Sequence, residues 1–301
     1  MANCIIRWSK AKYNLLRYLS LGASLFAFTT KRRRAFREWA DDRIIKIFEN
    51  ELKDFISKYP KTYNSEETIN HIIQTRCSVS RFGDGEFKLI IGERHKSFQD
   101  VNTELNRRML EVLRSDNKNI MIGIYRIVDL EHMPKIWKKF AIRIGPNVLS
   151  LLDSNRKYYS AMAFRDIPTD SKENFIKRVK LVKQIWQDRE VVIVVGTGSR
   201  FIFEEDLFNN IASVNFVYGP AKNAFDEYDR IIDDVCNYPK SCLILIVLGP
   251  TATVMAYDLA LKGYQAIDFG QMPGLYRKGK ELLFGDIDRD ILNYSQGQSN
   301  A

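Results

Sequence analysis

The chain has 301 residues, of which 45% are hydrophobic and 28% are charged, a composition typical of a globular protein with one large or two modest domains. Its net charge of +9 comes from residues 1–37, which hold nine Lys and Arg and no Asp or Glu. The other 37 basic and 37 acidic residues balance, which argues against a protein that binds nucleic acid. Three histidines and four cysteines show no C-x-x-C or H-E-x-x-H spacing, so we expect no zinc site and a reduced, cytosolic setting.

The N-terminal segment combines an apolar run with a basic cluster. Residues Tyr18–Thr30 carry no charge and are followed directly by Lys31-Arg32-Arg33-Arg34. The run is shorter than the roughly 20 residues that span a bilayer. Leucine and aromatic side chains beside cations favour a segment that lies on an anionic membrane surface, and an ordinary first helix with a solvated basic face is the alternative. We therefore expect a cytoplasmic protein. Residues 1–37 either bind peripherally to the inner face of the membrane or form an ordinary first helix.

The first half of the chain mixes helical and strand-like patterns. We expect a basic amphipathic helical segment over 1–40, a single α/β domain over 41–290 and a polar tail over 291–301. Residues 77–91 predict a strand, a turn at Gly83–Gly85 and a helical continuation. The other predicted elements of this half are helices at 35–60, 64–76, Asn102–Ser115 and Leu130–Ile144, and strands at Ile120–Ile124 and Val148–Leu152.

The second half of the chain alternates apolar strands with amphipathic helices. Fully apolar strands of this kind are typical of a mainly parallel sheet with helices on both faces, and ligands bind beyond the carboxyl ends of such strands. The predicted helices are 172–187, Ala221–Cys236 and Ala252–Lys262, and the predicted strands are Val191–Val195, Val214–Tyr218, Cys242–Leu248 and Gln265–Phe269.

An acidic pair follows the strand predicted before Gly83. Asp84 and Glu86 flank Gly85, and a tight turn there places both carboxylates on one side of the chain. Hard divalent cations are often held by one or two carboxylates and the phosphates of a substrate. The triplet is therefore a candidate for holding a metal ion against a nucleotide diphosphate, and a plain surface turn is the alternative.

Two glycine-containing loops follow later strands and are candidate phosphate sites. A helix that starts after a glycine and a proline offers unpaired N–H groups to phosphate, and plain capping is the alternative. A G-x-G loop followed by arginine is likewise either a phosphate site, with the arginine paired to phosphate, or a plain turn with a surface arginine. The residues concerned are Gly249, Pro250, Thr251 and Thr253 in one loop, and Gly196, Ser199 and Arg200 in the other.

Asp268 stands at the end of the last predicted strand, two residues before Gly270. A carboxylate there is placed to bind ribose hydroxyls, a metal ion or an acceptor, and a loop cap is the alternative. Tyr125, Tyr158 and Tyr159 are candidates for stacking on a base or a sugar, although aromatic residues of this kind more often belong to the core.

Two segments, 78–87 and 248–270, together resemble the GT-D-type bacterial glycosyltransferases, a family that carries a D-x-E motif and was formerly of unknown function. The resemblance spans about residues 70–275. It implies a Rossmann-like fold, a UDP-hexose donor, Mn²⁺ or Mg²⁺ as cofactor, and transfer of the sugar to a growing glycan, either lipid-linked surface polysaccharide or glycoprotein. It matches Asp84 and Glu86 to the D-x-E positions, as metal ligands and catalytic residues.

The resemblance also assigns further residues. It adds Arg81, Phe82, Gly83 and Gln271 to the donor-binding residues of the two glycine-containing loops. Asp268 is counted with the catalytic residues, and the base that deprotonates the acceptor is expected to be Asp268, Glu205 or Asp206.

The chain departs from the family pattern in two places. After Gly270 the family has a histidine and then an acidic-tyrosine-acidic-tryptophan stretch, where this chain has Gln271 to Lys278. The family's Gly-Val-Gly-Asn is replaced by Ile202-Phe203-Glu204-Glu205. These departures motivate an alternative function, a catalytically inactive nucleotide-sugar-binding partner or scaffold in a glycan-assembly complex.

Overall fold

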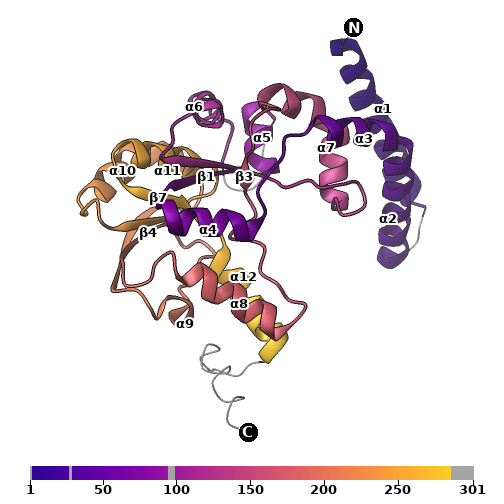
Figure 1. Ribbon diagram of the computed structural model, residues 1–301. Coiled ribbons are helices and arrows are strands. Elements are labelled where there is room, and N and C mark those ends of the chain that lie inside the picture. The colour runs from indigo at the N-terminus through magenta and orange to yellow at the C-terminus, as the bar shows by residue number, and fades with distance from the viewer. Residues whose placement is uncertain (1, 27–28, 94–98, 286–301) are drawn as a thin grey trace. The chain divides into compact units, whose positions relative to one another are not determined.

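The structure, a computed structural model, describes residues 2–26, 29–93 and 99–285 (Figure 1). Contacts group the chain into two compact units, one of residues 1–61 and 127–157 and the other of residues 62–126 and 158–301. The domain boundary expected at residue 40 stays a prediction, and helix α2 (Thr30–Ile47) runs through it. The expected polar tail at 291–301 lies outside the described residues.

The first unit is helical, and its basic N-terminal segment forms helices as expected. Helix α1 packs on α2 and α7, with the rings of Tyr13 and Phe48 meeting edge to face at 6.2 Å between centroids. Helix α3 packs on α7, where a Cβ atom at Gly145 would come within 2.9 Å of the Phe55 ring. Among the described residues, no helix combines the length and the hydropathy needed to cross a membrane. The helices of this unit are α1 (Ala2–Ser24), α2, α3 (Glu49–Lys58) and α7 (Lys135–Leu151).

The strand predicted at Val148–Leu152 is wrong. Residues 148–151 form the last turn of α7, and Leu152 is its C-cap. A short apolar run fits a strand and a buried helix equally well, so its pattern alone does not decide between them. Here Ile144 and Val148, one helical turn apart, are both fully buried, so helical packing determines the structure.

The second unit contains a seven-stranded parallel sheet in the order β3-β2-β1-β7-β6-β4-β5, which confirms the predicted α/β class. Its central strands β1, β7 and β6 are buried along their whole length, as expected for a sheet covered by helices, and β6 is entirely apolar. The two-residue strand β3 was not predicted. The strands are β1 (Ser78–Phe82), β2 (Ile120–Ile124), β3 (Tyr159–Ser160), β4 (Glu190–Thr197), β5 (Ser213–Pro220), β6 (Leu243–Val247) and β7 (Gln265–Asp268).

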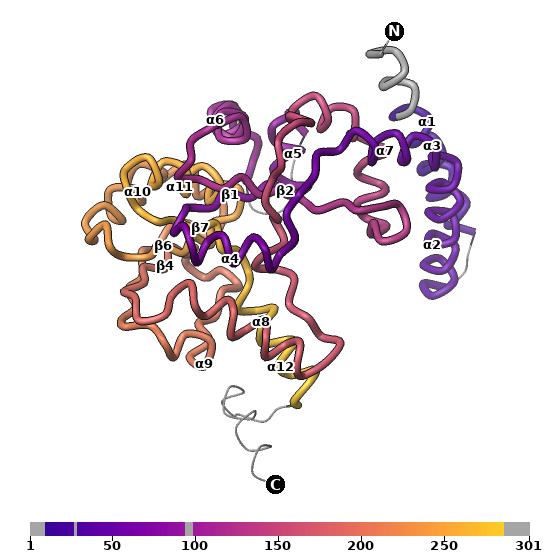
Figure 2. Tube along the Cα trace, viewed as in Figure 1, coloured from indigo at the N-terminus to yellow at the C-terminus, as the bar shows by residue number. Residues whose placement is uncertain are grey.

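Contacts divide most helices of this unit into two groups, which lie on opposite sides of the sheet (Figures 1 and 2). One group contains α6 (Thr103–Arg114), α10 (Tyr228–Cys236) and α11 (Pro250–Leu261). The other contains α4 (Ser65–Thr75), α8 (Lys172–Lys183), α9 (Glu205–Phe208) and α12 (Met272–Phe284). The short helix α5 (Asp84–Ile90) contacts β1 and α6, and a 3-10 turn, η1 (Ala224–Glu227), precedes α10.

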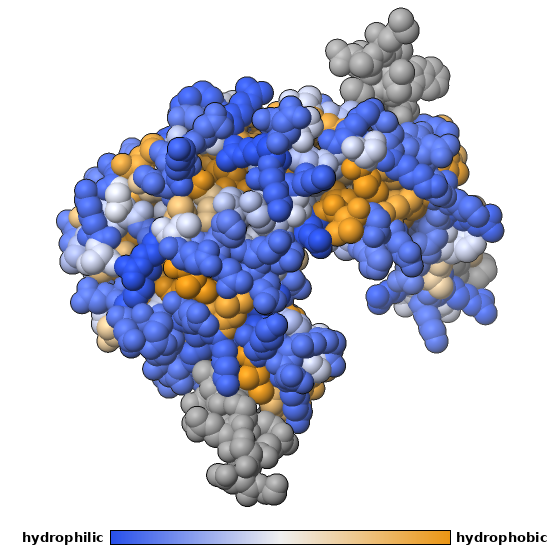
Figure 3. Space-filling model, viewed as in Figure 1, coloured by the Kyte–Doolittle hydropathy of each residue, from blue (hydrophilic) through white to orange (hydrophobic). Residues whose placement is uncertain are grey.

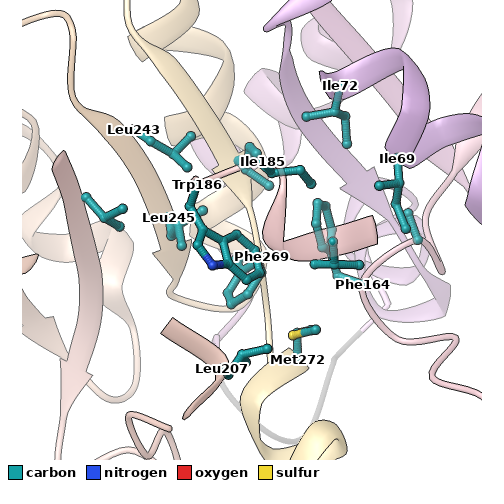
Figure 4. Close-up of a cluster of buried hydrophobic side chains, with 14 of the residues drawn as sticks. Ile69, Ile72, Phe164, Ile185, Trp186, Leu207, Leu243, Leu245, Phe269 and Met272 are labelled. Carbon is teal, nitrogen blue, oxygen red and sulfur yellow. The ribbon is translucent and has the colours of Figure 1, made fainter. Parts of the chain in front are cut away.

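A large aromatic and aliphatic core lies between the sheet and the group of helices that includes α4 and α8. Trp186 packs against Phe269, with ring centroids 5.8 Å apart (Figure 4), and against Phe208, with ring centroids 5.1 Å apart. Ile69 and Ile72 come from α4, and Leu243 and Leu245 from β6. This core packs against the sheet and supports the strands whose ends form the edge described below. The face of the molecule shown in Figure 3 is mostly hydrophilic, with scattered apolar patches.

Candidate active site

The sheet order places two glycine-containing loops at a topological switch point. Strands β4 and β6 are neighbours, but the chain passes from β4 to β5 on one side and from β6 to β7 on the other. In open α/β sheets, ligands bind outside the carboxyl ends of the strands where the connections diverge in this way. Strand β4 ends at Gly196-Thr197 and the loop to Arg200 follows it, while Gly249 and the first turn of α11 follow β6, so both segments lie at this edge.

The second loop is joined to the end of β1 by buried hydrogen bonds. The hydroxyl of Ser80 donates to the carbonyl oxygen of Thr253 at 2.6 Å, and the hydroxyl of Thr253 donates to the carbonyl oxygen of Arg81 at 3.1 Å. Thr253 Oγ1 also lies 3.4 Å from Asp268 Oδ2. The first turn of α11, the end of β1 and the end of β7 therefore meet at one buried polar junction.

A buried ion pair lies at the centre of this junction. Arg81 Nη2 donates to Asp268 Oδ1 at 2.7 Å, and Arg81 Nε donates to the carbonyl oxygen of Asp268 at 2.5 Å. The third nitrogen, Nη1, donates to the carbonyl oxygen of Ala161 at 3.2 Å. Both side chains of the pair are about nine-tenths buried, so the guanidinium faces into the protein.

Gly270 is required where it stands, directly after this pair. Its φ of +64° is unfavourable for residues with a side chain, and a Cβ atom there would lie 2.5 Å from Arg81 Nη2. The guanidinium thus passes close beneath the backbone of Gly270.

The acidic triplet starts helix α5 and does not form the tight turn that the sequence predicts. Gly83 is the N-cap, and its N–H donates to Glu86 Oε2 at 2.8 Å. A carboxylate at the third helical position accepts this bond readily, because the first N–H groups of a helix have no partner within it. Asp84 pairs with Lys88 one turn later, and its side chain is 40% exposed. One acid therefore faces the helix start and the other is accessible from outside.

The pKa of Glu86 is raised, mainly because its carboxyl is buried and secondly because the Asp268 carboxylate lies near it. Hydrogen bonds from the backbone and the charge of Arg81 oppose this shift without cancelling it. Glu86 and Asp268 are thus two acids close enough for their charges to interact, with Arg81 as the neighbouring cation.

A divalent cation fits part of this arrangement. Asp84 offers an accessible carboxylate, and one such ligand together with donor phosphates suffices for Mg²⁺ or Mn²⁺. Glu86 in this structure accepts a backbone N–H, so its part in metal binding stays a prediction. In the parts of the chain that the structure describes, no three His, Cys, Asp or Glu side chains come together as a metal site.

The predicted donor-binding residues fall into two classes. Arg81, Phe82, Pro250, Thr251 and Thr253 are buried, so in this structure they shape the site from beneath and are not placed to touch a ligand directly. The accessible or partly accessible ones are Gly83, Ser199, Arg200, Gly249 and Gln271. Gly196 is buried because the backbone of Ala221 approaches it, so that a Cβ atom at Gly196 would lie 2.7 Å from Ala221 Cα.

A second polar cluster, not predicted as a unit, lies between α9 and α12. A cavity of about 320 Å³ is lined by Glu204, Glu205, Asp206, Asn209 and Lys280. Lys280 Nζ and the hydroxyl of Tyr276 donate to Asp206 Oδ2 at 2.7 and 2.6 Å, and Arg277 pairs with Glu204. Burial opposes the shift, but these hydrogen bonds lower the pKa of Asp206.

Sequence reasoning missed Ser80 and Lys88. The Asp84–Lys88 spacing of four residues was a readable signal, because such residues are neighbours on a helix. No local signal points to Ser80, whose partner lies 173 residues further along the chain. The tyrosines proposed for stacking differ in burial, since Tyr158 is buried while Tyr125 and Tyr159 are partly exposed. The ring of Tyr159 stacks on Tyr63.

Comparison with known proteins connects this geometry to one family. The chain is 31% identical over 227 residues to the "Probable glycosyl transferase Gly" of Streptococcus gordonii, and 28% identical over 218 residues to "Glycosyltransferase GlyD" of Streptococcus pneumoniae. Each match covers 70% of this chain but only 32% and 26% of the relative. The chain thus spans about a third or less of the length of these curated relatives.

Solved structures show the same fold over most of the chain. A structure of the highly conserved domain of unknown function 1792, described as having a distinct glycosyltransferase fold, matches with a TM-score of 0.71 and 28% identity over 80% of this chain and 88% of its own. A glycosyltransferase with the same domain from Streptococcus sanguinis matches with a TM-score of 0.68 and 26% identity, over 77% and 88% of the two chains. The model of the family with the glycosyltransferase GT-D fold matches residues 79–278, and the chain belongs to this family.

Proposed function

We propose that this chain transfers a hexose from a UDP-sugar to a growing glycan, with Mn²⁺ or Mg²⁺ as cofactor. The observation that carries the proposal is the buried junction of β1, β7 and α11. It joins the end of β1, which the start of α5 with the accessible acid Asp84 directly follows, to the first turn of α11. Membership of the GT-D family and the names of the relatives support the reaction class.

In this reaction the acceptor hydroxyl attacks the anomeric carbon of the donor, and the bond from that carbon to the diphosphate breaks. A bound divalent cation would supply charge neutralisation for the departing diphosphate. Asp84 would hold this cation, and Gly249, the exposed N-cap of α11, would let the diphosphate approach the positive end of this helix. Arg81 and Asp268 would keep β1, β7 and the start of α11 in register.

The three candidate bases differ in their surroundings. Asp268 is paired with Arg81, and Asp206 is paired with Lys280. Glu205 is exposed, so it is the first of the three to test as the group that deprotonates the acceptor. We propose that the acceptor glycan is carried by a lipid or a protein at the inner face of the membrane.

The test is turnover of a panel of UDP-sugars with Mn²⁺, with Mg²⁺ and with a chelator. A preceding thermal-shift screen selects the donor, because a ligand that binds the folded state raises the melting temperature. We expect Asp84→Asn to lower turnover by about 100-fold or more, the size typical of losing one charge-stabilising group. The matched control is Glu104→Gln, which removes another acid from the first turn of a helix, where it is paired with Arg107. Full activity of the double variant Asp84→Asn/Glu86→Gln contradicts the metal role.

The second candidate function is an inactive nucleotide-sugar-binding scaffold. It is favoured by the position of Glu86, which caps its own helix, and by the ion pairs that occupy Asp206 and Asp268. Titration calorimetry separates the two functions. Binding of UDP without turnover of any donor supports the scaffold, and turnover excludes it.

A further inference from the structure

Helix α1 exposes three of its large apolar side chains to solvent in the part of the helix whose side chains the structure describes. Leu15, Tyr18 and Leu19 are exposed by 60% or more, and so are Leu25 and Phe26, which directly follow the helix. We call these five residues the α1 stripe. A helix turns about 100° per residue, so Leu15 and Leu19 lie on the same side of α1, and Leu25 and Phe26 follow in the turn after the helix. Contiguous exposed apolar residues of this kind mark an interaction surface.

The opposite face of α1 is the one turned to the rest of its unit. Tyr13 and Ser24 are buried there, and the hydroxyl of Ser24 accepts a hydrogen bond from Arg37 Nε at 3.2 Å. The inward face of the helix thus includes a tyrosine and a serine, while Leu15 and Leu19 are turned outward. A surface helix in a globular protein usually turns its leucines towards the core.

Basic residues precede, interrupt and follow the α1 stripe along the chain. Lys12 and Arg17 are exposed on α1, and the first turns of α2 contain Lys31, Arg32, Arg33 and Arg34. Residues 1–37 contain no acid that would repel an anionic partner. Apolar insertion combined with cationic contacts is the chemistry of a helix lying in the plane of an anionic lipid surface.

We propose that the α1 stripe inserts into the headgroup region of an anionic membrane while the basic start of α2 contacts the lipid phosphates. The proposal is independent of glycosyl transfer, because it uses no residue of the candidate active site. It specifies which residues enter the lipid and which stay at the charged surface.

The test is co-sedimentation of the purified full chain with vesicles of phosphatidylcholine, with and without phosphatidylglycerol. The stripe variant is Leu15→Gln/Leu19→Gln/Phe26→Gln, in which glutamine preserves helix propensity. We expect its partition coefficient on anionic vesicles to fall by about tenfold or more, because buried CH₂ groups drive such binding. The control, Ile202→Gln/Leu261→Gln/Leu282→Gln, removes three exposed apolar residues of the second unit and should bind like the wild type.

Two further variants make the result decisive. A conservative variant, Leu15→Met/Leu19→Met/Phe26→Leu, should retain binding. This result would show that the apolar character of the three side chains, and not their shape, determines binding to the vesicles. A charge variant, Lys31→Gln/Arg32→Gln/Arg34→Gln, should lose about tenfold or more on anionic vesicles only, since each cation near such a surface contributes about fivefold.

Two results overturn the proposal. One is equal binding of the stripe variant and the wild type, with circular dichroism showing that both are folded. The other is a wild type that ignores vesicles but elutes as a dimer that the stripe variant abolishes, because the stripe then binds a second copy of the chain. Turnover of a UDP-sugar in solution should be unchanged in the stripe variant, so failure here is distinguishable from failure of the proposed function.

Discussion

Two regions of the chain reverse the usual placement of side chains, in opposite senses. At the ends of β1 and β7, Arg81 and Asp268 are charged groups in the protein interior. Along α1, Leu15 and Leu19 are apolar groups in solvent. Buried charge and exposed apolar surface are the informative exceptions to the rule that apolar residues lie inside. The first fixes an internal geometry, and the second leaves a surface available to a partner.

The comparison is tested most strongly at Arg81. Replacing it by alanine leaves Asp268 buried without its cation, so we expect Arg81→Ala to lower the free energy of unfolding by about 3–5 kcal/mol in urea denaturation. Arg107→Ala breaks an exposed ion pair and should change it by less than about 1 kcal/mol. Equal effects of the two substitutions would show that the buried Arg81 pair contributes no more to the free energy of unfolding than an exposed pair does.

Substitution of Gly270, compared with substitution of Gly198, tests how tightly the Arg81–Asp268 pair is packed. Gly270 and Gly198 have similar φ angles of +64° and +69°, but only Gly270 lies against Arg81, and a Cβ atom at Gly198 meets open space. Gly198→Ala should cost about 1–2 kcal/mol of unfolding free energy through backbone strain. Gly270→Ala should cost about 1–3 kcal/mol more, because the new methyl group displaces the guanidinium. Identical melting curves for the two variants contradict this close approach.

Glu86 provides a test through pH. Its pKa is raised in the folded state by burial and by Asp268, so the folded chain holds this proton more tightly than the unfolded chain. The stabilisation by the protonated form is present below the ordinary pKa of about 4.3 and is lost as pH rises through the folded pKa. Glu86→Gln keeps an oxygen for the Gly83 N–H and removes the charge. We expect it to stabilise the protein at pH 7, by about 1 kcal/mol, and to have little effect below pH ~4. Glu104→Gln, at an exposed site, should show no such gain.

The smallest effect is expected on α1. The stripe variant Leu15→Gln/Leu19→Gln/Phe26→Gln should change the free energy of unfolding by less than about 0.5 kcal/mol per substitution. The three side chains are exposed to water in the folded wild type, so replacing them removes little buried apolar surface. Calorimetric melting of the two proteins, in the absence of lipid, measures this. A large loss of stability would show that the stripe is covered by the protein itself.

The sequence was sufficient for features that local patterns encode. The apolar runs of β4 and β6 predicted buried parallel strands, and the glycines after them placed both loops at the carboxyl ends. The segment Val148–Leu152 was assigned wrongly, because its packing against other helices is not visible in a five-residue pattern.

In the candidate site, too, contacts between residues far apart in the chain could not be predicted from local patterns. Asp84 and Glu86 were found from their spacing, but their different orientations follow from helix capping by Gly83. The pairing of Arg81 with Asp268 joins residues 187 positions apart, and no periodicity reports such a contact. Asp268 was therefore considered for ribose, metal or proton transfer, whereas its side chain is paired in the interior.

The order of the strands has a consequence for biosynthesis. Strand β7 is the last strand of this sheet in chain order, yet it lies between β1 and β6 in the middle of the sheet. Until Gln265–Asp268 has emerged, β1 and β6 each present an open hydrogen-bonding edge. The sheet consequently cannot close before β7 has been synthesised, because β7 pairs with two strands that precede it in the chain.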